Sequence, residues 1–337
     1  MKVLSLKQCL ARFTFLLCCA IGLVGCWRPA TSESITLYSG RSQHLLAPLL
    51  EEFTRQTGIQ VNTRYGGTAE LAATILEEGE RSPADVFFAQ DAGALGALAR
   101  AGRFHPLPPA LLAKVPAPFR SQEGLWVGTS GRARVLLYNL DRVAPEALPA
   151  DLDALTDPVW RERVGWAPFN ASFQAFVTAL RVERGEAAAR QWLEDMAANR
   201  PRPYARNTAI LQAVASGEID IGLTNHYYLH TMQREQGGQW RAANYIPPSG
   251  TLMNVAGVGI LATSRQHHQA EQFLQFLLSE TAQRFFTDET FEYPLVEGVA
   301  ANPALPALHT IPRADLDLGL LEDLAGTLAL LQELGIL

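Results

Sequence analysis

Short apolar strands alternate with amphipathic helices along this chain, and this alternation is the feature that most restricts its fold. Residues 35–38 are an extended apolar segment, residues 45–53 carry apolar side chains at helical spacing, and residues 59–61 open a second apolar segment. This order is typical of a parallel β-α-β unit. Residue 164 begins a second block of the same kind. The alternation predicts an α/β fold.

Polar and glycine-containing turns follow the predicted strands. They lie at residues 39–44, at residues 65–68, and at Gln90 and Asp91. The carboxyl ends of parallel strands meet at one edge of a sheet, where helix N-termini present free N–H groups. We therefore expect a ligand site along this edge.

Two extended segments contain glycines and are candidates for crossings between two lobes. They are residues 126–138 and residues 255–261. Arg132 and Arg134 alternate within the first segment, where they either pair with carboxylates or face the cleft. Glycine absorbs the φ and ψ changes of a hinge, and about 310 residues exceed what one hydrophobic core usually serves. The lobes are predicted at residues 34–131 with 253–302, and at residues 132–252 with 303–337. A last helical stretch is predicted at residues 316–334 and is interpreted as packing on the second lobe.

The first 25 residues have the features of a bacterial lipoprotein signal peptide. Lys2, Lys7 and Arg12 precede a nearly continuous apolar run, and the sequence LVGC at residues 23–26 resembles a lipoprotein cleavage box. The apolar run is shorter than the span of about 20 residues that crosses a membrane. We expect cleavage before Cys26, lipidation of that cysteine, and a flexible tether over residues 26–33.

Cysteine usage and charge exclude several classes of function. All four cysteines, at positions 9, 18, 19 and 26, lie in the leader or at its cleavage point. The exported fold therefore has no disulfide, cysteine metal site or cysteine nucleophile. Removal of residues 1–25 leaves 25 basic residues against 34 acidic ones, which is a net charge of −9. This sign disfavours a nucleic-acid partner.

A pair of adjacent tyrosines follows a predicted strand. In residues 219–224 apolar and polar side chains alternate, and Asn225, His226, Tyr227 and Tyr228 come next. A phenol has a free pKa of about 10, so a strongly charged cation such as ferric iron is needed to hold it as phenolate at neutral pH. The pair is a candidate metal site, and packing of two half-buried rings is the alternative.

The chain resembles the periplasmic ferric-ion-binding proteins of ABC importers. The resemblance covers nearly the whole mature chain and rests on an ordered set of short motifs. They are LYSGR at 37–41, SPADVFF at 82–88, SGRAR at 130–134, YARN at 204–207, LQAV at 211–214, GEID at 217–220, NHYY at 225–228 and EYPL at 292–295. It implies a two-lobed periplasmic-binding-protein (Venus-flytrap) fold with two hinge crossings, which closes on ferric iron and delivers it to a permease and ATPase.

The resemblance also implies roles for particular residues. Tyr227 and Tyr228 match iron ligands. Many members carry a histidine nearer position 42 than His44, and a glutamate where this chain has Gln90. His44, Gln90, Tyr65, Asp91 or water are the candidates for the remaining coordination positions. The residues that match a site for a synergistic anion such as phosphate or carbonate are Asn170, Ala171, Ser172, Asn207 and Asn225.

The sequence also leaves alternatives to ferric binding. Relatives of the same fold bind thiamine, phosphonates or polyamines, and a ligand-sensing domain is a further alternative. An enzyme would need His226 or His230 as a base, but the sequence has no serine nucleophile elbow and no second His/Asp cluster. We therefore predict a non-enzymatic, monomeric binding lipoprotein, anchored by Cys26 in the periplasm or at the cell surface.

Overall fold

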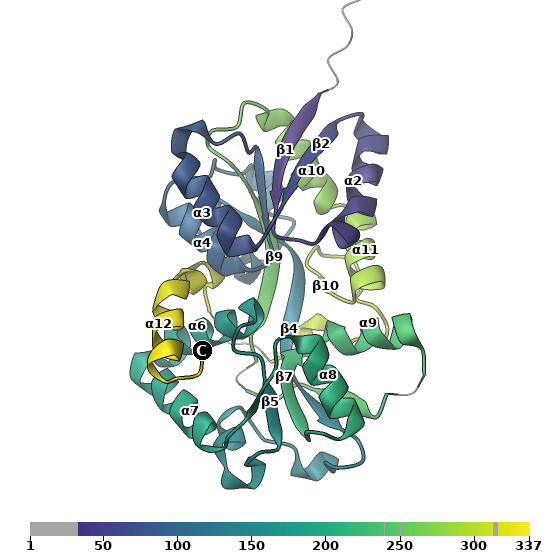
Figure 1. The fold of residues 1–337 in the computed structure, drawn as a ribbon. Helices are drawn as coiled ribbons and strands as arrows, with labels where there is room; N and C mark the ends of the chain where they lie inside the picture. Colours follow the sequence, from purple (N-terminus) through teal and green to yellow (C-terminus); the bar gives the residue numbers. More distant parts are fainter. Residues whose placement is uncertain (1–32, 239, 250, 313–315) are drawn as a thin grey trace, which may run out of the picture. The chain divides into compact units, whose positions relative to one another are not determined.

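The computed structural model describes residues 33–238, 240–249, 251–312 and 316–337, and residues 34–337 form one unit (Figure 1). The signal peptide, Cys26 and most of the tether lie outside the described residues. The predicted α/β class is confirmed. The strands are β1 (Ser34–Ser39), β2 (Gln60–Tyr65), β3 (Val86–Ala89), β4 (Val127–Asn139), β5 (Val164–Trp166), β6 (Arg202–Pro203), β7 (Ile221–Asn225), β8 (Ala242–Tyr245), β9 (Met253–Ile260) and β10 (Tyr293–Pro294).

Strand β4 belongs to two groups of strands. The hydrogen-bonded order is β2-β1-β3-β9-β4-β7-β5-β6, with β8 and β10 also paired to β4. The first half of β4 pairs antiparallel with β9 as far as Ala133, and the second half pairs antiparallel with β7 from Arg134 onward. β1 is parallel to β2 and β3, and β5 is parallel to β6 and β7. β4 thus runs without a break through the predicted crossing.

Helices cover both faces of each group of strands. Figure 1 shows α3 and α4 on one side of β1 and β9, with α2, α10 and α11 on the other, and α6 and α7 across β5 and β7 from α8. The helices are α2 (Gln43–Thr57), α3 (Thr68–Glu78), α4 (Ala92–Arg100), α5 (Pro109–Leu112), α6 (Ala171–Arg184), α7 (Glu186–Ala198), α8 (Asn207–Ser216), α9 (Tyr227–Gln236), α10 (His267–Leu277), α11 (Glu280–Thr290) and α12 (Leu324–Glu333).

Several of the motifs quoted above form buried polar contacts between distant segments. Arg41, just beyond β1, donates to Glu292 at 2.8 Å, and both side chains are at most 3% exposed. Ser130 of β4 also donates to Glu292. Asp85 accepts from the Thr36 backbone N–H at 2.8 Å. Such groups are costly to bury unless they are paired. These motifs therefore fix the ends of the strands.

The C-terminal segment departs from the predicted single helix over residues 316–334. It consists of the 3₁₀ helix η7 (Leu318–Glu322) followed by α12. η7 packs on α4 at two glycines, because a Cβ on Gly96 would lie 2.1 Å from the Gly319 carbonyl oxygen and a Cβ on Gly93 would lie 2.5 Å from that of Leu321. The backbone of η7 therefore lies directly against α4.

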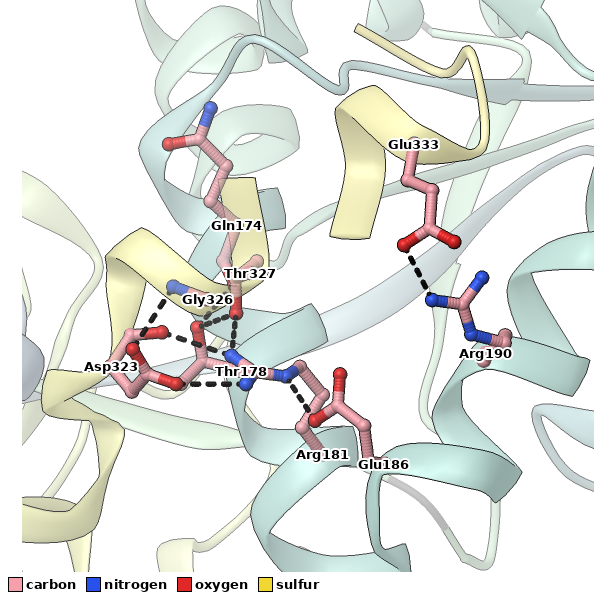
Figure 2. Close-up of polar contacts among 9 residues, drawn as sticks. All are labelled: Gln174, Thr178, Arg181, Glu186, Arg190, Asp323, Gly326, Thr327 and Glu333. Carbon is pink, nitrogen blue, oxygen red and sulfur yellow. Dashed lines mark hydrogen bonds and ion pairs between the residues drawn. The ribbon is translucent and has the colours of Figure 1, made fainter. Parts of the chain in front are cut away.

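Helix α12 is fixed to α6 by a cluster around Arg181 (Figure 2). Arg181 donates to the Asp323 carboxylate at 2.8 Å, to the Asp323 carbonyl at 3.0 Å and to the Thr327 hydroxyl at 2.9 Å. Thr178 and Thr327 share a buried hydroxyl contact of 2.8 Å. The C-terminal segment thus contacts α4 through η7 and α6 through α12.

The predicted division of the chain into two lobes, with its boundaries, stays a prediction.

Arg181→Met is expected to lower the free energy of unfolding by about 1 to 2 kcal/mol, because it removes charge-assisted hydrogen bonds from a partly buried cluster. Hydrogen exchange should rise in α12 more than in α6. Arg190→Met is the matched control, since its bond to Glu333 at 2.7 Å is solvent-exposed and exposed ion pairs contribute little to stability. Equal losses in the two variants, measured by urea unfolding, would contradict the anchoring role.

Within the described part of the chain, no helix combines the length and apolar character needed to span a bilayer.

Candidate functional site

A cavity of about 710 Å³ lies where several strands end and helices begin. Gln90 and Asp91 line it after β3, and Asn225 lines it at the end of β7. The first turns of α3, α4, α6 and α9 also contribute lining residues. The cavity therefore occupies the edge of the strands at which the sequence predicts a ligand site.

The two predicted tyrosines line this cavity together. Tyr227 and Tyr228 form the first turn of α9, directly after β7 and His226. Their ring centroids are 4.3 Å apart and the rings are inclined by 29°, so the phenols are stacked. Burial, followed by the nearby Tyr228, raises the pKa of Tyr227 above its ordinary value. Burial therefore favours the protonated phenol of Tyr227, and a strong cation is needed to displace its proton.

No group of three or more His, Cys, Asp or Glu side chains suited to a metal occurs among the described residues. A metal bound in the cavity would therefore depend on oxygen ligands other than a carboxylate cluster. Phenolate oxygen is a hard donor that suits a hard trivalent cation. The stacked tyrosines are the residues in the cavity with this chemistry.

His226 is held as a neutral ring by two backbone groups. Its Nδ1 accepts from the Ala133 N–H at 3.1 Å, and its Nε2–H donates to the Phe291 carbonyl at 2.7 Å. Burial lowers its pKa to about 4. Both nitrogens are thereby used, so His226 positions α9 against β4 and has no free nitrogen for catalysis or metal binding. His230 stacks on Phe291 with ring centroids 5.4 Å apart and does not line the cavity.

Two buried guanidinium groups line the cavity beside the tyrosines. Arg132 and Arg134 lie on β4 and are 3% and 4% exposed. Neither forms an ion pair with a carboxylate among the described residues, and the Nε atoms of both lack hydrogen-bond partners there. Burial lowers the pKa of Arg134 to about 10. The sequence left open whether these arginines pair with carboxylates or face the cleft, and the structure shows the second arrangement.

Four of the five predicted anion-binding residues line the cavity. Asn170, Ala171, Ser172 and Asn225 line the cavity. Asn170 caps α6 by accepting from the Ser172 N–H at 2.9 Å, and Arg134 donates to the Ser172 hydroxyl at 3.2 Å. Asn207 is not among the lining residues but donates to the Ser172 hydroxyl at 3.1 Å. It therefore supports the loop, and its role toward an anion stays a prediction.

Only two of the four other candidate metal ligands line the cavity. Gln90 and Asp91 line the cavity, and Asp91 caps α4 by accepting from the Ala94 N–H at 3.4 Å. Burial raises the pKa of Asp91, an effect that Arg132 partly offsets. His44 is exposed on the first turn of α2, and Tyr65 is half-buried at the end of β2; neither lines the cavity. Their coordination roles stay predictions.

The sequence reading missed one wall of the cavity. Leu321, Leu324, Ala325 and Leu328 of the C-terminal segment line it, although this segment was interpreted as packing. A signal was present in the sequence, because these positions follow the i, i+3, i+4, i+7 spacing of one helix face. That spacing cannot show whether the face meets a core or a cavity.

The strands, the cavity and its polar residues define a two-lobed solute-binding protein, which is the predicted fold class. The family profile described as bacterial extracellular solute-binding protein matches residues 81–317. The chain belongs to this family.

Named relatives bind iron. The chain is 32% identical over 299 residues to the Fe(3+)-binding periplasmic protein of Serratia marcescens, covering 87% of this chain and 86% of that protein. It is similar to iron-bound HitA from Pseudomonas aeruginosa, with a TM-score of 0.83, 33% identity and coverage of 90% and 99% of the two chains. It is also similar to the Trichodesmium protein IdiA (FutA) in complex with iron and citrate, with a TM-score of 0.80, 32% identity and the same coverage.

Proposed function

We propose that this protein is the substrate-binding component of an ABC importer, captures ferric iron between its two lobes and delivers it to a membrane permease driven by an ATPase. The observation that carries the proposal is the stacked Tyr227–Tyr228 pair in a cavity that Arg132 and Arg134 also line, neither of which forms an ion pair within the described part of the chain. The relatives' names support iron as the cargo and the periplasm as the compartment. The protein acts by binding, as a monomer and without catalysis.

Both tyrosines coordinate the iron as phenolates. Asp91, Gln90, His44, Tyr65 or water complete the ligand set. A synergistic anion of the phosphate, carbonate or citrate type binds at the N-terminus of α6, where Asn170, Ala171 and Ser172 line the cavity. Helix N-termini favour anions because their backbone N–H groups are free.

A visible absorption spectrum tests the proposal directly. Purified protein titrated with ferric iron should develop a charge-transfer band from tyrosinate to iron. A ligand of the thiamine, phosphonate or polyamine type would give no such band. Absence of the band with phosphate, carbonate and citrate each supplied would contradict ferric binding.

The lobes proposed are residues 34–131 with 253–302 and residues 132–252 with 303–337. β4 passes continuously from one to the other, and the Leu252 carbonyl accepts from the Arg134 N–H at 2.8 Å where the chain returns. Closure about these crossings would bring the α3 and α4 side of the cavity toward the α6 and α9 side. Small-angle scattering with and without ferric iron measures this closure.

Cys26→Ser is expected to release the protein from the membrane while ferric affinity stays unchanged. The thiol is proposed to carry a lipid anchor and no other function, and stable anchoring requires the acyl chains. Membrane fractionation followed by iron titration of the released protein checks both parts. Retention of the variant in the membrane fraction would exclude anchoring through Cys26.

A further inference from the structure

The C-terminal segment contacts helices from both proposed lobes. The helix α12 is fixed to α6 of the second lobe by the Arg181 cluster (Figure 2). The preceding 3₁₀ helix η7 lies directly against α4, which belongs to the first lobe. In the proposed division of the chain, residues 303–337 belong to the second lobe. Besides the two crossings, η7 therefore makes a further contact between the lobes.

Two glycines of α4 allow η7 to approach so closely. Gly93 and Gly96 are helical, and neither has the positive φ that would require glycine. Glycine inside a helix is less stable than alanine, and Gly96 does not line the cavity. A Cβ on Gly96 would lie 2.1 Å from the Gly319 carbonyl oxygen. The neighbour that excludes a side chain at this position is therefore the backbone of η7.

Buried leucines and an ion pair complete the contact. Leu318 and Leu321 of η7 are 4% and 3% exposed. Glu322, the last residue of η7, pairs with Arg100 in the last turn of α4. The Arg100 side chain is 70% exposed and that of Glu322 is 11% exposed. The ion pair thus lies at the edge of the contact, where a charge can be changed without entering the core.

The junction between η7 and α12 is fixed to the second lobe. Asp323 is the one residue between the two helices, and Arg181 of α6 donates both to its carboxylate and to its carbonyl. The Asp323 carboxylate also accepts from the Gly326 N–H. Because η7 ends one residue before this fixed point, it moves with the second lobe. Movement of α4 away from α6 must therefore break the contact between α4 and η7.

We propose that η7 is a latch, whose contact with α4 limits how far the two lobes separate. Leu321 and Glu322 line the cavity, so the latch forms part of the cavity wall. Opening requires η7 to leave Gly96 and the pair with Arg100 to break. The latch therefore slows the release of bound ferric iron. This inference rests on the proposed two-lobed ferric-binding function and names a regulation of its site.

Gly96→Ala tests the latch at its closest contact. Alanine favours the helical form of α4, but its Cβ would lie on the Gly319 carbonyl oxygen and displace η7. Small-angle scattering of the iron-free full chain should show a larger radius of gyration than in the wild-type protein. Hydrogen exchange should accelerate at least about tenfold in residues 318–322 and stay unchanged in α12. Ferric release to a chelator should be at least about fivefold faster, the lower end of typical coupling between two sites.

Charge reversal tests the same contact without changing the glycines. Arg100→Glu places a second carboxylate beside Glu322 and should also enlarge the iron-free protein; Arg100 is exposed, so the variant should fold, which a thermal melt checks. Arg100→Glu combined with Glu322→Arg restores an opposite pair and should return the radius of gyration to the wild-type value. The radius is the decisive measurement for this double variant, because Glu322 also lines the cavity.

Arg190→Glu is the matched control for the charge reversal. It makes the same change at the exposed ion pair between Arg190 of α7 and Glu333 of α12. Both helices belong to the second proposed lobe, so the radius of gyration and the rate of ferric release should stay at their wild-type values.

Two results would overturn the latch and leave ferric binding intact. One is an unchanged radius of gyration in both Gly96→Ala and Arg100→Glu, which would show that η7 only packs on α4. The other is an equal expansion in Arg190→Glu, which would assign the effect to general loosening of the C-terminal segment. Absence of the charge-transfer band in the wild-type protein would instead refute ferric binding, and scattering of the iron-free variants would still decide whether η7 holds the lobes together.

Discussion

Tyr227→Phe and Tyr228→Phe should each lower ferric affinity by more than about a hundredfold while the apo protein unfolds at nearly the same temperature. Loss of an outer-shell partner alone lowers metal affinity 10- to 100-fold, and each variant removes a direct oxygen ligand. Phenylalanine keeps the ring in the stack with centroids 4.3 Å apart. The free energy of unfolding should therefore change by less than about 1 kcal/mol.

Tyr65→Phe is the matched control for this experiment. It makes the same chemical change at a predicted ligand that does not line the cavity. Iron titrations and thermal melts of the three variants are run together, with Gln90→Ala as a second comparison. If Tyr227→Phe and Tyr228→Phe keep wild-type affinity and the charge-transfer band, the tyrosine pair is packing. A loss in Tyr65→Phe would instead place Tyr65 among the ligands in the closed protein.

The local features of the fold were predictable because they depend on short-range periodicity. The alternation of apolar and polar residues in 219–224 predicted β7 and placed the tyrosines at its carboxyl end. The glycine-bearing segment of residues 126–138 predicted the long strand β4. Strand ends at Gln90 and Asp91 predicted two lining residues of the cavity.

Long-range partners could not be predicted in the same way. Arg41 and Glu292 form a buried ion pair although they are 251 positions apart. Arg132 and Arg134, with similar sequence surroundings, have no carboxylate partner among the described residues. Whether a buried arginine has a carboxylate partner depends on which segment packs over it. The spacing of residues along the chain does not identify that segment. The sequence therefore predicted two alternatives for Arg132 and Arg134, and the structure was needed to choose between them.

The C-terminal segment illustrates the same limit for apolar residues. Residues 316–334 were predicted as one packing helix, but the chain changes from η7 to α12 at Asp323, whose side chain accepts from the Gly326 N–H at 3.0 Å. This local cap begins a new helix. It allows one part of the segment to follow α4 and the other to follow α6. As a result both η7, through Leu321, and α12, through Leu324, Ala325 and Leu328, line the cavity.

Iron uptake should release protons, and ferric affinity should fall steeply with pH. A free phenol has a pKa of about 10, and burial raises the pKa of Tyr227 above that value. Coordination removes one proton from each phenol. With free ferric iron held constant by a chelator, affinity should decrease about tenfold per pH unit for each proton released. Two phenolates therefore predict a decrease of about a hundredfold per unit of acidification below pH 8.

Comparison of the wild-type protein with Tyr228→Phe isolates this effect. In the variant one phenol remains, so the slope should be about tenfold per pH unit, and proton release in weak buffer should fall by one proton per iron. Proton uptake by the released chelator is the same for both proteins, so it cancels in the difference. Because His226 keeps its two backbone contacts in the variant, its titration also cancels. Equal proton release from the two proteins would show that Tyr228 does not bind iron as phenolate.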